Sequence, residues 1–374
     1  MELLKFMRKI KLNINQKNQN YPLIIGSNII SKFSNFIKDY NFKISKYFFV
    51  IDKNVPKKIV KSLIGSLNKK NITIYYFTAT EKNKVQKSVD LILDKMLKIN
   101  FSRDDCLVAV GGGITGDITA YTASLFKRGI NFINVPTTLL SQVDSAIGGK
   151  TGVNTKNGKN LIGTFYQPKM VISDTNFLKS LSRRDIVCGY AEILKHSLIA
   201  NKNFYFYLKK NISQILNLKS PYIENSIFES CKIKKNIVEK DEKEINLRRT
   251  LNFGHTFAHA YEAALGYSKK LNHGEAVILG MYTALNFSYK KNLINKNNFL
   301  EIINHIKNSN LPNNLSNYFS LNDIKKIVSF MTNDKKNKSK KINLILLRKI
   351  GKPIINKNFN QKYLISFLKK ELVN

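Results

Sequence analysis

Short apolar runs alternate with longer amphipathic stretches through the first half of the chain. The runs at 47–51, 72–77 and 106–110 are rich in β-branched and aromatic residues and have the length of strands. The stretches between them carry apolar residues at the spacing of helices. Strands that alternate with helices predict parallel βαβ units, so we expect an α/β domain built on a parallel sheet.

The second half of the chain has a different pattern. Helix-period stretches at Ile186–Leu208, Ile223–Lys240 and Thr256–Leu265 dominate, and the next run that resembles a strand is Ile342–Leu347. A strand-like run, Met170–Ile172, ends the first pattern. We therefore predict two domains, an α/β domain at 1–176 and a mainly α-helical domain at 177–374.

Length and composition agree with two globular domains. The chain has 374 residues, of which 43% are hydrophobic, whereas single cores stop growing at roughly 250–300 residues. The three cysteines, Cys106, Cys188 and Cys231, lie far apart, and no run of 18 or more apolar residues occurs. We therefore expect a cytoplasmic protein without a disulfide framework and without a membrane partner.

The charge of the chain is strongly positive. There are 62 Lys and Arg against 25 Asp and Glu, a net charge of +37, which raises the alternative of a nucleic-acid-binding protein. Only eight of these cations are arginine, the lysines are scattered, and no nucleic-acid-binding motif accompanies them. Drift toward A/T-rich codons explains this better, so we expect no nucleic-acid partner and a small anionic substrate.

A glycine-rich turn, Gly111–Asp117, directly follows the run at 106–110 and precedes a helix-period segment. Glycines there let backbone amides approach a pyrophosphate at a helix N-terminus, which is typical of dinucleotide sites. The alternative is a tight turn without a ligand. Asp52, at the end of an earlier strand, is a candidate for a ribose contact or a turn former, and the hydroxyl-rich loop Val135–Asp144 is a candidate nicotinamide lining.

Three of the five histidines lie within nineteen residues, and a carboxylate stands in an apolar helix upstream. His255 and His259 are spaced i, i+4 on one helix face, His273 precedes another apolar helix, and Glu192 is the carboxylate. Imidazole and carboxylate ligands without thiolate suit a catalytic divalent metal such as Zn²⁺. The alternatives are ordinary structural histidines and a Glu192–Lys195 pair, and the spacing leaves open which histidine is a base.

Several cations stand beside glycines or in apolar segments, where they suit phosphate or carboxylate groups: Arg128, Lys150, Lys159, Lys195 and Arg248. Taken singly, each lysine is an ordinary surface residue. Their occurrence together with the candidate metal ligands favours a role in binding an anionic substrate.

Seven segments, in order along the chain, together resemble the 3-dehydroquinate synthase family: Gly111–Asp117, Val135–Ser145, Gly148–Thr151, Gly158–Pro168, Ala191–Lys195, Leu251–Ala260 and His273–Val277. The resemblance runs from about Tyr21 to Lys352. It implies an N-terminal NAD-binding α/β domain, a C-terminal helical metal domain and a homodimer. The implied reaction converts 3-deoxy-D-arabino-heptulosonate 7-phosphate to 3-dehydroquinate and phosphate, through transient oxidation at C5 by NAD, with Zn²⁺ or Co²⁺.

The resemblance also implies roles for individual residues. The implied metal ligands are Glu192, His255 and His273, and His259 is implied to transfer protons. The implied substrate contacts are Arg128 (from a neighbouring subunit), Asp144, Lys150, Lys159, Asn160, Lys195, Lys234, Arg248, Asn252 and one of Lys335 and Lys336, among which Lys150, Lys195, Arg248 and Asn252 are also catalytic candidates. The implied NAD contacts are Asp52, Glu81, Lys84, Gly112, Gly113, Ile114, Asp117, Thr137, Thr138, Asp144, Lys150, Lys159, Phe177 and Ser180. Thr78–Glu81 departs from the family's usual pattern by lacking a turn glycine.

Two related classes remain as alternatives. Other sugar phosphate cyclases make valiolone-type or inosose-type rings, but Asn252 and the run Asp334–Lys336 resemble the dehydroquinate branch. Iron-type polyol dehydrogenases share the architecture and release reduced NAD.

Overall fold

The structure is a computed structural model that describes residues 7–14, 19–332 and 341–373, so Lys335 and Lys336 lie outside the described residues. Tertiary contacts divide the chain into two compact units. The first unit is Met1–Ser182 with Leu218–Glu239, and the second is Arg183–Asn217 with Lys240–Asn374. The predicted domains, 1–176 and 177–374, differ from this division mainly at Leu218–Glu239, a helical segment whose contacts place it with the first unit.

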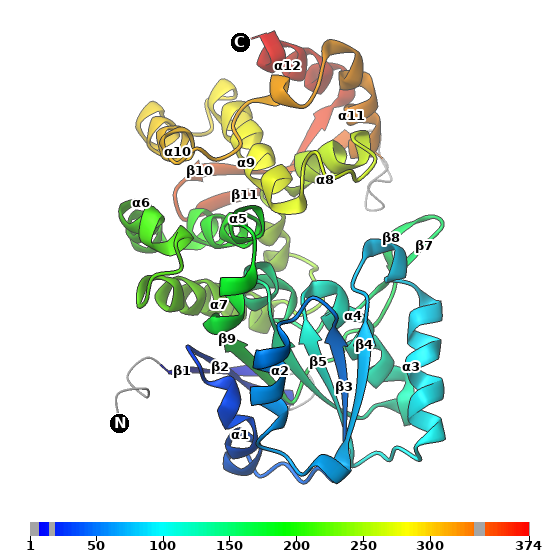
Figure 1. Ribbon diagram of the computed structural model, residues 1–374. Coiled ribbons are helices and arrows are strands. Elements are labelled where there is room, and N and C mark those ends of the chain that lie inside the picture. The colour runs from blue at the N-terminus through cyan, green and yellow to red at the C-terminus, as the bar shows by residue number, and fades with distance from the viewer. Residues whose placement is uncertain (1–6, 15–18, 333–340, 374) are drawn as a thin grey trace. The chain divides into compact units, whose positions relative to one another are not determined.

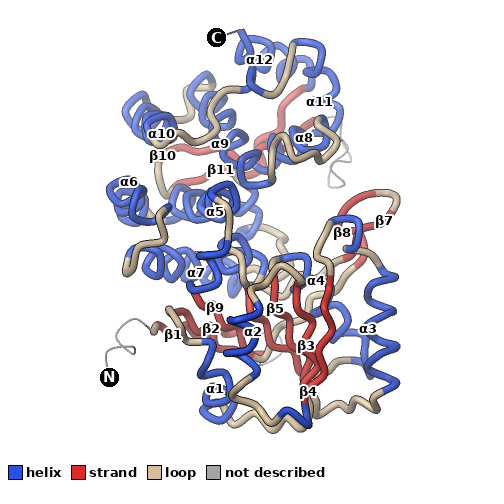
Figure 2. The backbone as a smooth tube through the Cα atoms, viewed as in Figure 1, coloured by secondary structure: helices blue, strands red, loops and turns tan. Residues whose placement is uncertain are grey.

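The first unit is built on one large sheet. Its elements are β1 (Arg8–Ile14), β2 (Gln19–Gly26), α1 (Phe33–Asp39), β3 (Tyr47–Asp52), α2 (Lys57–Ile64), β4 (Ile72–Phe77), α3 (Gln86–Lys98), β5 (Cys106–Gly111), α4 (Gly113–Leu125), β6 (Asn131–Pro136), β7 (Val153–Thr155), β8 (Gly158–Ile162), β9 (Met170–Asp174) and α7 (Tyr222–Lys240). The seven-stranded sheet has the order β1-β2-β9-β6-β5-β3-β4, and Figure 2 shows its strands gathered between helices. All neighbouring strands are parallel except β1 and β2. The predicted α/β fold with a parallel sheet is confirmed, with one antiparallel strand at its edge.

Both faces of this sheet are covered by apolar side chains. Phe49 and Ile51 of β3 pack in a core that includes residues of α1 and α2, whereas Phe48 and Val50 pack in a core that includes residues of α3 and α4. Helices lie around the sheet accordingly (Figure 1). A strand buried on both faces needs apolar residues at consecutive positions, which explains why the strands are continuous apolar runs in the sequence.

The second unit is mainly helical. Its elements are α5 (Arg183–Ala200), α6 (Lys202–Leu216), α8 (His255–Ala264), α9 (His273–Lys290), α10 (Lys296–Asn308), α11 (Ile324–Thr332), β10 (Lys341–Lys349), β11 (Lys352–Asn360) and α12 (Gln361–Val373). Helix α9 packs against α5, α8, α10 and the hairpin β10–β11 (Figure 1). The prediction of a mainly helical second half is confirmed in this unit. Among the described residues, no helix has both the length and the apolar character needed to cross a bilayer.

Two details of the second half differ from the sequence prediction. The stretch Ile186–Leu208 is two helices, because Asn201 leaves the helical conformation and its side chain caps α6 by accepting a hydrogen bond from the Phe204 N–H at 3.0 Å. Strand β11 was not predicted, because its sequence, KPIINKNFN, is rich in lysine and asparagine and has no regular alternation of polar and apolar residues, so its pairing with β10 is what identifies it.

A buried histidine gives the second unit a pH-dependent stability. His305 of α10 is only 3% exposed, its Nε2 lies 3.3 Å from the Tyr190 hydroxyl, and its ring lies 5.3 Å from that of Tyr205. Burial, assisted by Lys209 and opposed by Glu301, lowers the pKa of His305 from 6.5 to about 4. The folded chain therefore holds this imidazole neutral at pH values where the unfolded chain protonates it.

We expect this residue to make acid destabilising. Because the pKa of His305 is lower in the folded chain than in the unfolded chain, its contribution to the free energy of unfolding is complete above about pH 6.5. That contribution decreases by about 3 kcal/mol in total as the pH falls toward 4. The variant His305→Gln, which keeps a polar group near Tyr190, should lose this component. Thermal unfolding at about pH 7.5 and about pH 5 checks it, since the stability gap between the native chain and the variant should narrow in acid. A gap that is the same at both pH values would contradict the assignment.

Candidate functional site

Three helices of the second unit approach one another closely because glycines stand at their crossings. A Cβ on Gly274 of α9 would lie 2.2 Å from the Cα of Cys188 in α5. A Cβ on Gly280 of α9 would lie 2.3 Å from the carbonyl oxygen of Gly254, the residue that precedes α8 and has a φ of +81°. Only glycine permits these approaches, so the sequence fixes α9 against both α5 and α8.

This packing gathers three side chains that were predicted as metal ligands. Glu192 comes from the middle of α5, whereas His255 and His273 are the first residues of α8 and α9. One ligand atom from each of the three lies within 4.8 Å of the others.

The Glu192 carboxylate is buried, and its two oxygens have different surroundings. Lys195, one turn further along α5, donates a hydrogen bond to Oε2. Oε1 lies 3.5 Å from Nε2 of His255 and accepts no hydrogen bond from any residue in the described part of the chain. A buried carboxylate oxygen without a donor, next to an imidazole nitrogen, is a costly arrangement that a bound cation would relieve. One carboxylate and two imidazoles therefore fit a divalent metal with open positions for substrate.

Both histidine rings are oriented through their other nitrogen. Nδ1 of His255 lies 3.4 Å from the carbonyl oxygen of Phe253, and Nδ1 of His273 lies 3.1 Å from Oε2 of Glu262. These acceptors favour the tautomer that carries its proton on Nδ1, which leaves Nε2 as the donor atom for a metal. Glu262 was not predicted as a site residue.

His259 lies beside this group without joining Glu192. It is exposed, and its ring centroid lies 5.3 Å from that of His255 and 6.1 Å from that of His273. With Glu262 and His273 it forms a second group of potential ligand atoms. The i, i+4 spacing left open which histidine is a ligand, and it is His255 whose nitrogen approaches the carboxylate.

Other candidates in the second unit are held by acidic or carbonyl groups. Arg248 is buried, and its guanidinium donates to the carbonyl of Glu242. The amide of Asn252 donates to Glu244 at 2.6 Å. Both side chains are thus positioned by the short segment that precedes α8.

In the first unit, the glycine turn lies at the carboxyl end of β5. Gly112 precedes α4, which begins at Gly113 and has no side-chain cap from the described residues. A Cβ on Gly113 would lie 2.9 Å from the Ser145 hydroxyl, and the Thr137 N–H donates to Gly111 at 2.9 Å. Part of the glycine requirement is therefore close packing against Ser145. The uncapped N-terminus of α4 is nevertheless suited to an anion.

A lysine joins three of the predicted segments around this turn. Lys84 is 6% exposed, and its ammonium lies 2.5 Å from Asp117 of α4 and 2.6 Å from the side-chain oxygen of Asn160 in β8. Burial raises the pKa of Asp117, and Lys84 opposes that shift. Glu81 lies 3.5 Å from the ammonium of Lys159. The structure thus brings together five residues that were predicted to contact NAD or substrate.

A further pair forms at a π-helical turn, Ser141–Ser145. The ammonium of Lys234, from α7, lies 2.5 Å from both the carboxylate and the carbonyl oxygen of Asp144. Gln142 of the same turn donates to the carbonyls of Pro136 and Asp174 at the ends of β6 and β9. A π-helical turn is rare and often occurs at functional sites.

Several other predicted residues lie outside these groups. The Asp52 carboxylate accepts a hydrogen bond from the Asn54 N–H at 3.0 Å, which supports its role as a turn former. Phe177 is fully buried in the apolar core, and its carbonyl accepts a hydrogen bond from the Ser180 hydroxyl at 2.8 Å, so the structure does not expose it to a dinucleotide. Arg128 and Lys150 are exposed.

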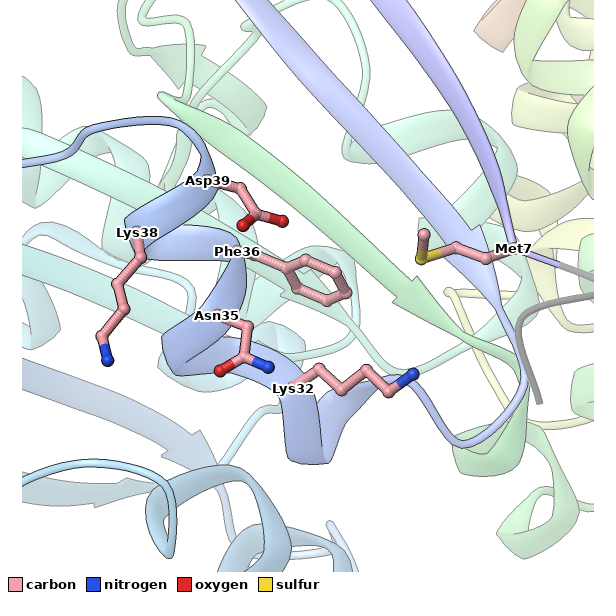
Figure 3. A pocket seen from close by; sticks show the side chains of 6 residues that line it. All are labelled: Met7, Lys32, Asn35, Phe36, Lys38 and Asp39. Carbon is pink, nitrogen blue, oxygen red and sulfur yellow. The ribbon is translucent and has the colours of Figure 1, made fainter. Parts of the chain in front are cut away.

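A pocket of about 300 Å³ on the first unit does not coincide with these residues (Figure 3). It is lined by Met7, Lys32, Asn35, Phe36, Lys38 and Asp39, at α1. None of them was predicted to bind NAD, metal or substrate, so we assign no function to this pocket.

Comparison with known proteins gives the family. Residues 74–188 match the family model for the 3-dehydroquinate synthase N-terminal region, and residues 189–337 match that for its C-terminal region. A 3-dehydroquinate synthase from Pelagibacter ubique (strain HTCC1062) is 56% identical over 366 residues, which cover 98% of this chain and 100% of that protein. The chain belongs to the 3-dehydroquinate synthase family. The predicted family and the enzyme class that goes with it, a lyase, are confirmed.

Solved structures agree on the fold of this 3-dehydroquinate synthase family member. A 2-deoxy-scyllo-inosose synthase, complexed with carbaglucose-6-phosphate, NAD⁺ and Co²⁺, has a TM-score of 0.86 at 24% identity and covers 98% of this chain and 100% of its own. A 2-epi-5-epi-valiolone synthase from Streptomyces hygroscopicus subsp. jinggangensis 5008, with NAD⁺ and Zn²⁺ bound, has a TM-score of 0.82 at 23% identity and covers 94% and 96%. The fold is therefore that of sugar phosphate cyclases.

Two residues of this family member make prominent contacts but were not predicted from the sequence. Glu262 stands three residues after His259, so the spacing on α8 could have indicated it. Asn154, whose amide contacts both Glu81 and Asn160, offered no signal, because asparagine is abundant in this chain and its partners are distant in sequence.

The Glu262–His273 contact generates a prediction about metal affinity. Because the carboxylate fixes the orientation and basicity of the His273 ring, Glu262→Gln should weaken Zn²⁺ binding by about tenfold and Glu262→Ala by up to about a hundredfold. Competition with a chromophoric chelator measures this without any activity assay. Glu301→Gln, which removes a carboxylate of α10 that pairs with Lys209, is the control and should leave metal affinity unchanged. Unchanged affinity in both Glu262 variants would rule out an orienting role.

Proposed function

We propose that this chain converts 3-deoxy-D-arabino-heptulosonate 7-phosphate to 3-dehydroquinate and phosphate, using NAD and a divalent metal. The observation that carries the proposal is the meeting of Glu192, His255 and His273 within 4.8 Å, in a chain 56% identical to a named 3-dehydroquinate synthase. The related cyclases with bound NAD⁺ and Co²⁺ or Zn²⁺ support the same cofactors here.

Each unit carries residues suited to one cofactor. Glu192, His255 and His273 of the second unit would hold Zn²⁺ or Co²⁺, and the N-terminus of α4, with Lys84, Asp117 and the Thr137–Thr138 segment of the first unit, would hold NAD. When bound, NAD⁺ would supply a reversible hydride acceptor for C5 of the substrate, and the metal would supply a Lewis acid for the hydroxyl at that carbon.

The chain's own residues would position the substrate and move protons. His259, exposed beside the metal group, is placed to accept or return a proton of the C5 hydroxyl. The candidate anion-binding residues would hold the phosphate and carboxylate groups: Arg128, Lys150, Lys159, Asn160, Lys195, Lys234, Arg248 and Asn252. Lys195 and Arg248 are buried, which pre-organises them for this role.

Three wider expectations stay predictions. They are a homodimer, to which Arg128 would contribute across the interface, a cytoplasmic location, and the absence of nucleic-acid and membrane partners. The sugar phosphate substrate agrees with the family.

The main test is phosphate release. With NAD⁺ and Zn²⁺ or Co²⁺, the purified chain should release inorganic phosphate from the heptulosonate phosphate without lasting NADH absorbance, because the hydride is returned in each turnover. A metal chelator should abolish this release. A polyol dehydrogenase would accumulate NADH with a polyol instead, and an inosose-type cyclase would act on another sugar phosphate. No phosphate release under these conditions would refute the proposal.

A second test separates metal binding from proton transfer. His259→Ala, a change at an exposed position, should keep stoichiometric metal and lose turnover by about 10²–10⁴-fold, the range of general acid–base catalysis. His255→Ala is the matched variant from the same helix and should lose metal. Metal content by atomic absorption, read beside turnover, decides the matter: metal loss in His259→Ala would mean that the ligand and the proton-transfer residue have been exchanged.

A further inference from the structure

Asn154 of β7 uses its backbone and both ends of its side-chain amide to join two segments of the first unit. Its Nδ2 donates to Oε2 of Glu81 at 2.7 Å and to the Glu81 carbonyl at 3.2 Å. Its Oδ1 accepts from the backbone N–H of Asn160 at 3.1 Å, and its own N–H donates to the carbonyl of Lys84 at 2.7 Å. One residue therefore holds the segment Glu81–Lys84 against the hairpin β7–β8.

The partners of Asn154 are connected to one another as well. Lys84 reaches both Asn160 and Asp117, and Lys159 of the hairpin lies 3.5 Å from Glu81. These five residues were all assigned to NAD or substrate, whereas Asn154 was assigned to neither. The side-chain amide of Asn154 connects Glu81 to Asn160 and so links the two ends of this set of contacts.

The β7–β8 hairpin depends on contacts with other segments for its position, because few backbone pairs join its two strands. Within their own bounds, strands β7 and β8 pair at Val153 with Ile162 and at Thr155 with Gly158, with a shift of register between the two pairs. The pairing continues only toward the base of the hairpin, where the Thr151 N–H donates to the Thr164 carbonyl at 3.0 Å. Two-stranded hairpins of this size have little stability of their own. Asn160 also has a φ of +53°, and the hydrogen bond from its N–H to Asn154 holds that left-handed backbone.

We propose that Asn154 is a positioning residue that fixes the β7–β8 hairpin against the Glu81–Lys84 segment, and thereby sets the affinity for NAD. The inference rests on the proposed function, since it takes Glu81, Lys84 and Lys159 as NAD contacts. Asparagine suits the position because it donates to a carboxylate and accepts from an amide at once. Aspartate would keep the acceptor but place a second negative charge beside Glu81.

The first experiment is a calorimetric titration of the full chain with NAD⁺. Asn154→Ala removes a hydrogen bond to a charged group and should weaken NAD⁺ binding by about tenfold, with metal content unchanged. Asn157→Ala, at the exposed tip of the same hairpin, is the control and should bind NAD⁺ as the native chain does. Equal affinity in Asn154→Ala and the native chain would overturn the inference and leave the proposed function standing. No NAD⁺ binding by the native chain would overturn both.

A double-mutant cycle distinguishes positioning from general loss of structure. Asn154→Asp should weaken NAD⁺ binding by more than tenfold, because two carboxylates then face each other. In the double variant Asn154→Asp with Glu81→Gln, a side-chain donor again faces an acceptor, so the affinity should return to that of Glu81→Gln alone. A cycle whose two effects simply add would show that the Asn154–Glu81 contact does not set NAD⁺ affinity.

Discussion

A single buried carboxylate imposes the strongest constraint on the second unit. Removing the Glu192 carboxylate from water costs several kcal/mol, and the ion pair with Lys195 satisfies only Oε2. A divalent cation at Oε1 would offset the remainder, and His255 and His273, the first residues of α8 and α9, would supply the other ligands. The glycines at the helix crossings keep these ligand atoms close together. Any side chain at Gly274 would push α9 away from α5, and His273 away from Glu192.

The first unit follows a different rule, that of open parallel sheets. The candidate residues Asp52, Gly112 and Thr137 directly end or follow β3, β5 and β6, because parallel strands bring their carboxyl ends to one edge of the sheet. The strands stay rigid through burial on both faces, and the loops at this edge carry the chemistry. The Lys84 ammonium then connects α4 to β8, which lies outside the sheet.

The sequence predicted the strands from local pattern, and it predicted the metal group from residue types together with the resemblance to the family. Apolar runs identified β3 and β5 almost to the residue, and Glu192 drew attention as a charge in an apolar helix. What the sequence did not reveal depends on partners that are distant along the chain. Asn154 differs in no visible way from other asparagines, and the helix α7 has ordinary helical periodicity, so only tertiary contacts place it with the first unit.

Burial distinguishes the lysines with a structural or functional role from those that reflect the lysine-rich composition of the chain. The chain has 54 lysines, and most of them carry no information because they are solvated. Among the described residues, three lysines are buried, Lys84 at 6%, Lys195 at 2% and Lys234 at 5% exposed. Each lies against a carboxylate, of Asp117, Glu192 and Asp144 respectively. A codon bias can add lysines to a surface at little cost, but it cannot keep an ammonium buried without an acidic partner. These three lysines are therefore distinguished from the solvated ones by burial and by an ion pair, and all three belong to the set that the proposed reaction needs.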